Sequence, residues 1–563
     1  MKSMRSIGFT YFKRHTWIEY LGATIVLIIA TFLAHGQSLY GSWRWDDGAH
    51  LSYAINYSPL QYFFNPEITR LQSGANLTPW NALFYDINIA LFGMNAAGHY
   101  SHLLIILALG VTLFYAVLRQ WLPPLPSMLG ATMVLLGKPT VHIAAGLMHG
   151  HYATGFALTM LSIWAWVQYF RERKTHQLVL SIFAYLLATT CKEIYVPLPL
   201  LLFFLPVTHV SERIRAILPF VLVGALYTGW RYLVLGRLIG GYSQGIFEKE
   251  SLFNQLLGIP ELLIDAKLYS FVFITLLTIH LFIFFSRKNI NYYFVFISII
   301  IAIIPLIPLT KFPGIYTADR YLFIPWITLS TYAAILLTNS KGSIYMVFGQ
   351  GALLFSLLFI HQQEKQRISG DLNQWDALSR FSLSIDKSRQ AIFLEPDDGY
   401  KRSMLTNTRY TADLLTPNSI PGNLHITYGS CMDLRDSQLL NMEIFELVNE
   451  KVTSMSDARR LEKIPIQHAK SMPLDSTISL AQGVLNWKFG PYHDGIYHVF
   501  INDDKNAYIV PKNGSVSWKF GKKFKLSFCS TRIDEGICSI SCSPKLDLDL
   551  TSTEATIWKG YGQ

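Results

Sequence analysis

Long apolar runs alternate with short polar segments over about the first 360 residues of the chain. A helix that crosses a bilayer needs about 20 mostly apolar residues. Eight runs approach that length, at 17–34, 101–118, 152–170, 216–235, 268–285, 291–309, 321–338 and 343–360, and three shorter or broken runs lie at 125–137, 177–190 and 194–206. The pattern predicts an α-helical polytopic membrane protein with about 11 transmembrane helices.

The first loop between these runs contains one further apolar segment, at 80–93. Its apolar residues recur at helical spacing, but its length gives only about four helical turns. A helix of this length does not cross the bilayer, so we expect it to lie in the membrane interface.

Basic residues indicate how the predicted helices are oriented, because short cytoplasmic loops are rich in Lys and Arg. If the N-terminus is cytoplasmic, every inner turn is basic: Arg119; Arg171, Arg173 and Lys174; Arg213 and Arg215; Arg287 and Lys288; Lys341. Eleven crossings place the C-terminal residues outside, whereas the loss of one crossing would place them in the cytosol. We expect a protein of the bacterial inner (cytoplasmic) membrane, with a cytoplasmic N-terminus and a periplasmic C-terminal domain.

The composition changes after residue 361, where charged residues, Asn and Ser become frequent and the long apolar runs end. This change predicts a transmembrane domain at 1–361 and a soluble C-terminal domain at 362–563. Residues 362–394 have an amphipathic helical pattern, and alternation of apolar and polar residues begins at about 477. Short alternating runs separated by turn residues are typical of a β-sandwich or a small barrel.

Composition excludes several classes of protein. Charged residues make up 15% of the chain, and the net charge of +10 is spread over the ends of apolar runs with no basic stripe for nucleic acid. The sequence contains no phosphate-binding glycine loop, dinucleotide fingerprint or kinase motif set. Cys431, Cys529, Cys538 and Cys542 permit disulfides outside the cytosol, and a zinc pair at Cys538 and Cys542 is the weaker interpretation because no second pair accompanies it.

A polar cluster follows the first apolar run: Asp46, Asp47 and His50. Ionisable groups at a membrane surface are functional candidates. A carboxylate there is suited to act as a general base, since partial burial raises its pKa. The alternative is a helix N-cap, which would use one aspartate.

A second group of candidates lies at the outer ends of later runs: Lys192, Glu193, Arg231 and Arg320. Three cations that converge on one leaflet would form a phosphate or diphosphate site. The alternatives are a Lys192–Glu193 pair that closes a helical hairpin, and arginines that anchor helix ends beside aromatic neighbours.

Three histidines, His142, His149 and His151, lie close together between two predicted helices. His149 and His151 are two residues apart, so a helix would place them on different faces. We therefore favour interfacial contacts or hydrogen bonds to a sugar over a metal site.

Several segments together resemble the GT-C superfamily of multi-span glycosyltransferases, especially the protein O-mannosyltransferases and their transmembrane TPR-containing relatives. The matching segments, which cover roughly the first 340 residues, are Trp45-Asp46-Asp47, Asn76-Leu77-Thr78-Pro79-Trp80, residues 90–95 and 99–102, Pro139 with His142, Cys191-Lys192-Glu193 with residues 194–199, Trp230-Arg231 with residues 232–236, and Asp319-Arg320-Tyr321 with residues 322–325. The chain differs at Ala144 or Ala145, where relatives tend to carry Glu, and near Gly150, where an Asp is missing.

The resemblance implies a catalytic role for Asp46 or Asp47 as the base, with His50 beside it. It also implies that Lys192, Arg231 and Arg320 bind the phosphate of a polyprenyl-linked donor. Glu193, His142 and His151 would orient the substrate. No cofactor is implied beyond the lipid-linked sugar, and dependence on a divalent metal stays open.

These observations predict a membrane glycosyltransferase that moves a sugar from a polyprenyl-phosphate donor to a periplasmic acceptor, either a protein or a surface glycan or lipid. The alternative is a transporter or flippase of a lipid-linked sugar that carries out no chemistry. The sequence leaves open which sugar is moved and which acceptor receives it.

Overall fold

The structure, a computed structural model, describes most of the chain up to residue 236 and separate segments beyond it. The described residues are 17–236 without 74–75 and 206, 318–338, 344–384, 391–394, 399–415, 424–427, 443–454, 474–481, 484–491, 496–501, 507–517, 523–534, 537–543, 545–549 and 556–562. The predicted helices at 268–285 and 291–309 lie outside these residues.

The chain divides into two units. The helical unit comprises Met1–Gly41, Ala54–Thr69 and Asn76–Ser369, and the C-terminal unit comprises Ser42–Tyr53, Arg70–Ala75 and Gly370–Gln563. The expected boundary at 361/362 is close to the division at Ser369. Residues 42–53, which carry Asp46, Asp47 and His50, belong to the C-terminal unit rather than to the membrane part.

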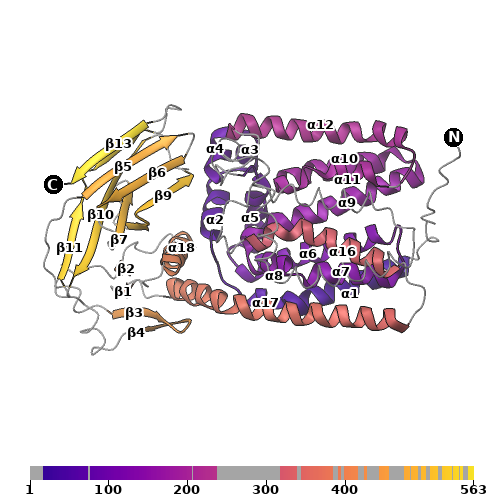
Figure 1. Cartoon of the computed structure of the whole chain (residues 1–563), viewed down its shortest axis with the longest axis horizontal. Coiled ribbons are helices and arrows are strands. Elements are labelled where there is room, and N and C mark those ends of the chain that lie inside the picture. Colours follow the sequence, from indigo (N-terminus) through magenta and orange to yellow (C-terminus); the bar gives the residue numbers. More distant parts are fainter. Residues whose placement is uncertain are drawn as a thin grey trace. The chain divides into compact units, whose positions relative to one another are not determined.

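Most of the helical unit consists of the segments that the apolar pattern predicts (Figure 1). Its elements are α1 (Trp17–His35), η1 (Gly36–Tyr40), α3 (Pro59–Phe64), α4 (Pro66–Gln72), α5 (Pro79–Phe92), α6 (Ala96–Leu118), α7 (Pro124–Leu136), α8 (Lys138–Ala145), η2 (Leu147–His149), α9 (Gly150–Glu172), α10 (Thr175–Cys191), η3 (Glu193–Tyr195), α11 (Leu198–Phe204), α12 (Val210–Leu235), η5 (Ala318–Leu322) and α16 (Phe323–Thr338), while α4 and α17 (Ile344–Ser384) contribute residues to both units.

Three of the described helices, α1 with η1, α6 and α12, are long and apolar enough to cross a membrane, and α7 with α8 forms a fourth candidate bent by 53°. The protein is therefore an integral membrane protein. The helix α10 is apolar but spans only 17 residues. The apolar segment Glu193–Phe204, which contains η3 and α11 with a break at Pro197, is shorter still. The predicted number of about 11 crossings stays a prediction.

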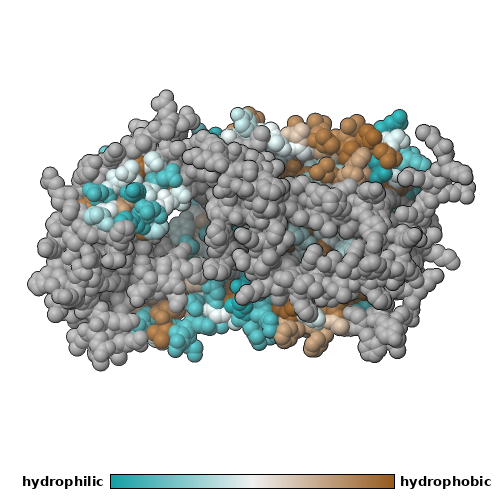
Figure 2. All heavy atoms as spheres, in the orientation of Figure 1, coloured by the Kyte–Doolittle hydropathy of each residue, from teal (hydrophilic) through white to brown (hydrophobic). Residues whose placement is uncertain are grey.

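Exposed apolar side chains on α12 mark a surface suited to lipid. Leu218, Val221, Leu222 and Leu226 are all more than half exposed. Figure 2 shows a continuous brown surface where Figure 1 places α12. In water such a patch would be costly, so this face fits contact with acyl chains.

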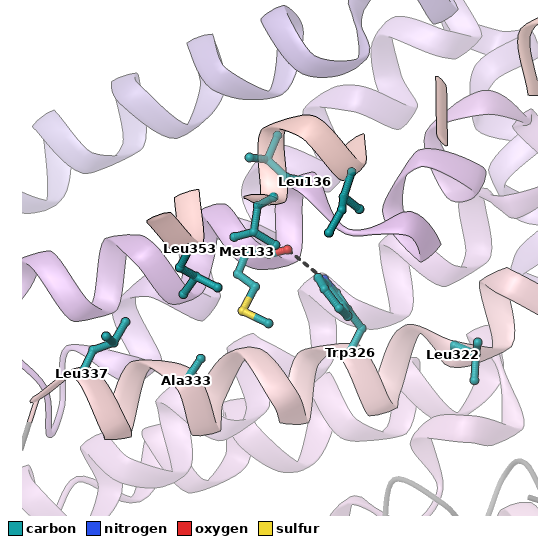
Figure 3. Close-up of a cluster of buried hydrophobic side chains, with 9 residues drawn as sticks. Met133, Leu136, Leu322, Trp326, Ala333, Leu337 and Leu353 are labelled. Atoms are coloured by element: carbon teal, nitrogen blue, oxygen red, sulfur yellow. Dashed lines mark hydrogen bonds between the residues drawn. The ribbon is translucent and has the colours of Figure 1, made fainter. Parts of the chain in front are cut away.

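Inside the helical unit, α7, α16 and α17 share a cluster of buried apolar residues around Trp326 (Figure 3). The indole Nε1 of Trp326 donates a hydrogen bond to the Met133 carbonyl at 2.7 Å. At Gly137, which ends α7, a Cβ would lie 1.9 Å from that nitrogen. Only glycine therefore allows α7 and α16 to pack this closely.

The C-terminal unit contains α2 (Asp47–Asn56), α18 (Gly399–Leu415) and three sheets. In the first sheet, β1 (Ala391–Leu394) pairs in parallel with β2 (Leu424–Thr427) and β3 (Glu443–Val448), and β4 (Lys451–Ser454) pairs antiparallel with β3. The other two sheets are antiparallel and contain β5 (Leu474–Ala481), β6 (Val484–Gly490), β7 (Ile496–Ile501), β8 (Ala507–Val510), β9 (Asn513–Ser517), β10 (Lys523–Asp534), β11 (Ile537–Cys542), β12 (Leu546–Asp549) and β13 (Thr556–Gly562).

The two antiparallel sheets share one apolar core. Phe489 on β6 stacks on Tyr497 of β7 and on Phe528 of β10, with ring centroids 5.4 and 4.6 Å apart. Side chains from both sheets therefore interdigitate, which is the packing of a β-sandwich. All three aromatic side chains are buried in this core, so they are not available to a ligand.

The helix that we expected over 362–394 is shorter in the structure. The helix α17 ends at Ser384, and residues 391–394 form β1. Strands also begin well before 477, at β1. The local sequence did not reveal β1 because its pairing partners lie more than 30 residues further along the chain, as the register Ala391 with Leu424 shows.

Cys529 and Cys542 form a disulfide across β10 and β11, where the two residues pair directly. Cys431 lies outside the described residues. Cys191 is buried and has a free thiol.

Candidate functional site

Asp46 and Asp47 lie at the start of α2 and have opposite environments. Asp47 is fully buried, and its Oδ2 accepts a hydrogen bond from the Arg44 backbone N–H at 2.7 Å. Asp46 is exposed. This bond runs back to a residue before the helix, so it closes the turn at residues 44–47 and is not the N-cap bond of the alternative interpretation, which would accept an N–H of the following helical turn. Asp46 is the carboxylate that solvent can reach.

His50 lies one turn after Asp46 on α2. Its backbone N–H donates to the Asp46 carbonyl at 3.1 Å, and its side chain is half-buried. His50 and Asp47 therefore share the short helix α2, and Asp46 lies in the turn directly before it.

In the helical unit, Glu193 joins two of the predicted cations. Its carboxylate forms an ion pair with Arg231 through Oε1, which also accepts the Leu77 backbone N–H at 2.7 Å. The Lys192 ammonium lies 3.9 Å from Oε2, which is longer than a hydrogen bond. Glu193 is therefore committed mainly to Arg231 and Leu77, and it compensates Lys192 only in part.

Lys192 is 5% exposed and lies between two tyrosine rings. Its Nζ is 5.6 Å from the ring centroid of Tyr152 on α9 and 5.9 Å from that of Tyr321 on η5. Arg320 contacts the same tyrosine, with its guanidinium 5.1 Å from the centroid of the Tyr321 ring. Aromatic faces attract cations but leave the ammonium donors of Lys192 available.

His149 lies within hydrogen-bonding distance of both Arg320 and the backbone carbonyl of His142. Its Nδ1 lies 2.8 Å from the His142 carbonyl, and its Nε2 lies 3.3 Å from Arg320 Nη1. A carbonyl only accepts, so Nδ1 carries the proton and Nε2 accepts from Arg320. Burial and the nearby Arg320 charge lower the pKa of His149 well below its ordinary value, so the ring is neutral.

His142 belongs to a second charged group, with Glu364 and Arg367 of α17. Its Nε2 lies 2.8 Å from Glu364 Oε1, and Arg367 Nη2 donates to the same oxygen at 2.6 Å. Burial opposes ionisation of Glu364, but hydrogen bonds from His142 and Arg367 outweigh it and lower its pKa to about 2. Glu364 is thus ionised at every physiological pH.

The structure brings together Lys192, Glu193, Arg231 and Arg320, which the sequence placed on three separate loops. It gives His151 a different environment, with its ring 4.6 Å from that of Tyr152 and its side chain buried. Sequence reasoning missed Tyr152, Tyr321 and Glu364. The available signal was the position of Tyr321 directly after Arg320 and of Tyr152 directly after His151. Glu364 had no such signal, because it comes from a helix more than 200 residues away from His142.

The described part of the chain contains no group of three or more His, Cys, Asp or Glu side chains that could hold a metal ion. His142 and His149 make the hydrogen bonds given above, and His151 packs against Tyr152. The interfacial contacts or hydrogen bonds to a sugar that we favoured for these histidines stay a prediction.

No protein-family model matches the chain, and no curated protein matches it. Among solved structures, the chain is similar to ArnT from Cupriavidus metallidurans in the apo state, with 13% identity, a TM-score of 0.41 and coverage of 76% of this chain and 93% of that one. ArnT bound to undecaprenyl phosphate gives 12% identity and a TM-score of 0.40 over 76% and 93% of the two chains.

The Archaeoglobus fulgidus oligosaccharyltransferase in the apo form gives 10% identity and a TM-score of 0.39, over 77% of this chain and 70% of that one. The resemblance to the GT-C superfamily is the one that the sequence motifs carry.

Proposed function

We propose that the protein is a membrane glycosyltransferase of the GT-C type that uses a polyprenyl-phosphate-linked sugar and an acceptor on the periplasmic side. One observation carries the proposal: Lys192 is buried at the end of a helix hairpin with only partial compensation by Glu193. A buried cation without a full counter-charge is costly unless an anion binds there. A lipid phosphate is an anion that a membrane enzyme meets at the bilayer surface.

In the proposed reaction, Asp46 accepts the proton of an acceptor hydroxyl. The oxygen attacks the anomeric carbon of the sugar while the bond between that carbon and the phosphate oxygen breaks. The polyprenyl phosphate leaves with the bonding electrons, and Lys192 and Arg320 stabilise the negative charge that develops on it. Asp47 holds the turn that carries Asp46. His50, Glu193, His142 and His151 are proposed to orient the reacting groups.

Replacement of Asp46 by Asn tests this proposal against transport without chemistry. A general base contributes about 10²–10⁴-fold to a rate, so we expect the Asp46→Asn variant to lose transfer by about that factor. The assay follows label from a panel of decaprenyl-phosphate-linked hexoses into whole cell envelope. Binding of decaprenyl phosphate to the purified variant should stay at the wild-type level.

Asp47→Asn is the matched control, because its amide oxygen still accepts the Arg44 N–H. We expect it to retain more transfer than Asp46→Asn. A flippase would show wild-type lipid movement in both variants and no transfer in any of the proteins, and that result would contradict the proposed function.

A further inference from the structure

The turn that carries Asp46 is attached to α17 by a buried ion pair. Arg44 Nε donates to Asp376 Oδ1 at 2.8 Å and Arg44 Nη2 donates to Asp376 Oδ2 at 2.7 Å, while Arg44 is only 4% exposed. Asp376 Oδ1 also accepts the Ser42 backbone N–H at 3.0 Å. A two-point pair of this kind fixes orientation as well as distance.

Two further contacts attach the same turn to α17. The hydroxyls of Ser42 and Ser379 lie 2.7 Å apart, and the rings of Trp45 and Trp375 have centroids 6.1 Å apart. Trp45 packs against the buried cluster that contains Trp375, Leu378, Phe393, Met404 and Leu405. The turn is thus part of the core formed by α17, α18 and the first sheet.

The backbone of the turn is strained where it meets this core. Trp45 has a φ of 46°, a conformation that bulky residues rarely adopt. Such a conformation persists only when surrounding contacts determine it, and it is found most often at functional sites. Trp45 directly precedes Asp46, so the same contacts determine where the Asp46 carboxylate points.

Helix α2 also contacts α18. A Cβ at Gly48 would lie 2.2 Å from Thr411 Oγ1, so the backbone of α2 touches α18 with no room for a side chain. Both α17 and α18, which lie far from this segment in sequence, therefore contact the turn or the helix that follows it.

We infer that Asp376 is a positioning residue for the reaction: through its two-point pair with Arg44 it holds the turn of Asp46 in the catalytic orientation. This inference rests on the proposed function of Asp46. It assigns to the residues after 370 a part in the chemistry. Asp376 itself does not contact the substrate in this role.

Amide hydrogen exchange of the full-length protein in lipid nanodiscs tests whether Asp376 holds the turn. Asp376→Asn keeps the shape of the side chain and removes its charge, so we expect exchange in peptides covering residues 44–50 to become roughly tenfold faster or more. Arg44→Lys, which keeps the charge but loses the planar fork, should have a similar effect. Unchanged exchange at 44–50 in both variants would overturn the inference.

Asn373→Ala is the matched control, one turn away on α17. Asn373 Nδ2 bonds to Glu450 at 3.1 Å and makes no bond to the turn in the described residues. Its replacement should leave exchange at 44–50 and transfer as in the wild type. An equal effect of Asn373→Ala would mean that any damage to α17 loosens the turn, which would contradict a specific role of Asp376.

Transfer kinetics separate positioning from a merely structural role. Misplacement of a catalytic group by about 1 Å can cost about a hundredfold, so kcat of Asp376→Asn should fall by roughly ten- to a hundredfold while decaprenyl phosphate binding and KM for the donor stay unchanged. Asp376→Glu should restore part of kcat. Faster exchange at 44–50 with wild-type kcat would overturn the inference.

Failure of the proposed function gives a different result. Wild-type transfer by Asp46→Asn would refute Asp46 as the base, and the catalytic role of Asp376 with it, whatever the exchange data show. Loss of transfer in Asp46→Asn together with full activity of Asp376→Asn would overturn only the inference.

Discussion

Adjacent residues of the same type have different uses in this chain. Asp47 is buried and bonds the Arg44 backbone, whereas Asp46 is exposed. The sequence alone could not distinguish the two environments, because the aspartates are adjacent at the start of the same helix. The difference comes from Trp45, whose positive φ turns the chain between Arg44 and Asp46.

Lys192 offers the most direct test of the phosphate site. A hydrogen bond to a charged group contributes about 1.5–3 kcal/mol, which is about 10- to 100-fold in affinity. We therefore expect Lys192→Gln to bind decaprenyl phosphate about 10- to 100-fold more weakly, as measured by calorimetry in detergent.

Lys174→Gln is the control for the loss of one positive charge. Lys174 is exposed, and its ion pair is with Glu172 at 2.8 Å on a different turn. Its affinity for decaprenyl phosphate should equal that of the wild type. Equal affinities of the Lys192 and Lys174 variants would exclude Lys192 from the phosphate site.

Glu364 gives a prediction about pH. Its pKa is lowered to about 2 by His142 and Arg367, with Lys138 also nearby, whereas an unfolded glutamate has a pKa of about 4.3. A lowered carboxyl pKa stabilises the folded state above the unfolded pKa, and this stabilisation is lost as the pH falls through the range from about 4.3 to about 2.

We expect Glu364→Gln to be less stable than the wild type by about 1–3 kcal/mol at neutral pH, since it removes the charged acceptor of the hydrogen bonds from His142 and Arg367. Thermal unfolding in detergent should show this difference between pH 5 and 8 and a smaller one as the pH falls below about 4. A difference that is constant down to the lowest pH would mean that the charge of Glu364 contributes nothing.

At the scale of elements, local patterns predicted what local forces determine. The apolar runs at 17–34, 101–118 and 216–235 each form a helix whose ends lie within six residues of the ends of the run. Breaks in the apolar pattern therefore indicate where these helices begin and end. The segment at 80–93 likewise became α5, which begins with Pro79 at its first turn and ends at Gly93 with a φ of 58°.

Contacts between elements that lie far apart along the chain could not be predicted from the sequence. The pairing of β1 with β2 and β3 overrode an amphipathic helical pattern at 391–394. The Arg44–Asp376 pair joins residues 332 positions apart, and Lys192 meets Tyr321 across more than 120 positions. Neither spacing nor periodicity carries information about such pairs. The phosphate-binding role of Lys192, Arg231 and Arg320, which their positions at the ends of apolar runs indicated, stays a prediction.

At the scale of the whole molecule, two independent features bear on the side of the membrane where the C-terminal unit lies. The inner turns expected from the basic residues lead to an outer C-terminus after eleven crossings. The disulfide between Cys529 and Cys542 belongs to an oxidising compartment. Both favour the periplasm.

Reporter fusions test this orientation. A reporter enzyme that is active only outside the cytosol should be active when fused after Gln563 and inactive when fused after Lys174, which lies on a predicted inner turn. If only a cytosolic reporter is active after Gln563, the number of crossings is even. One of the short helical segments, at α7, α10 or α11, would then not cross the membrane, and Cys529 and Cys542 would be reduced in the cell because cytosolic thiols are kept reduced.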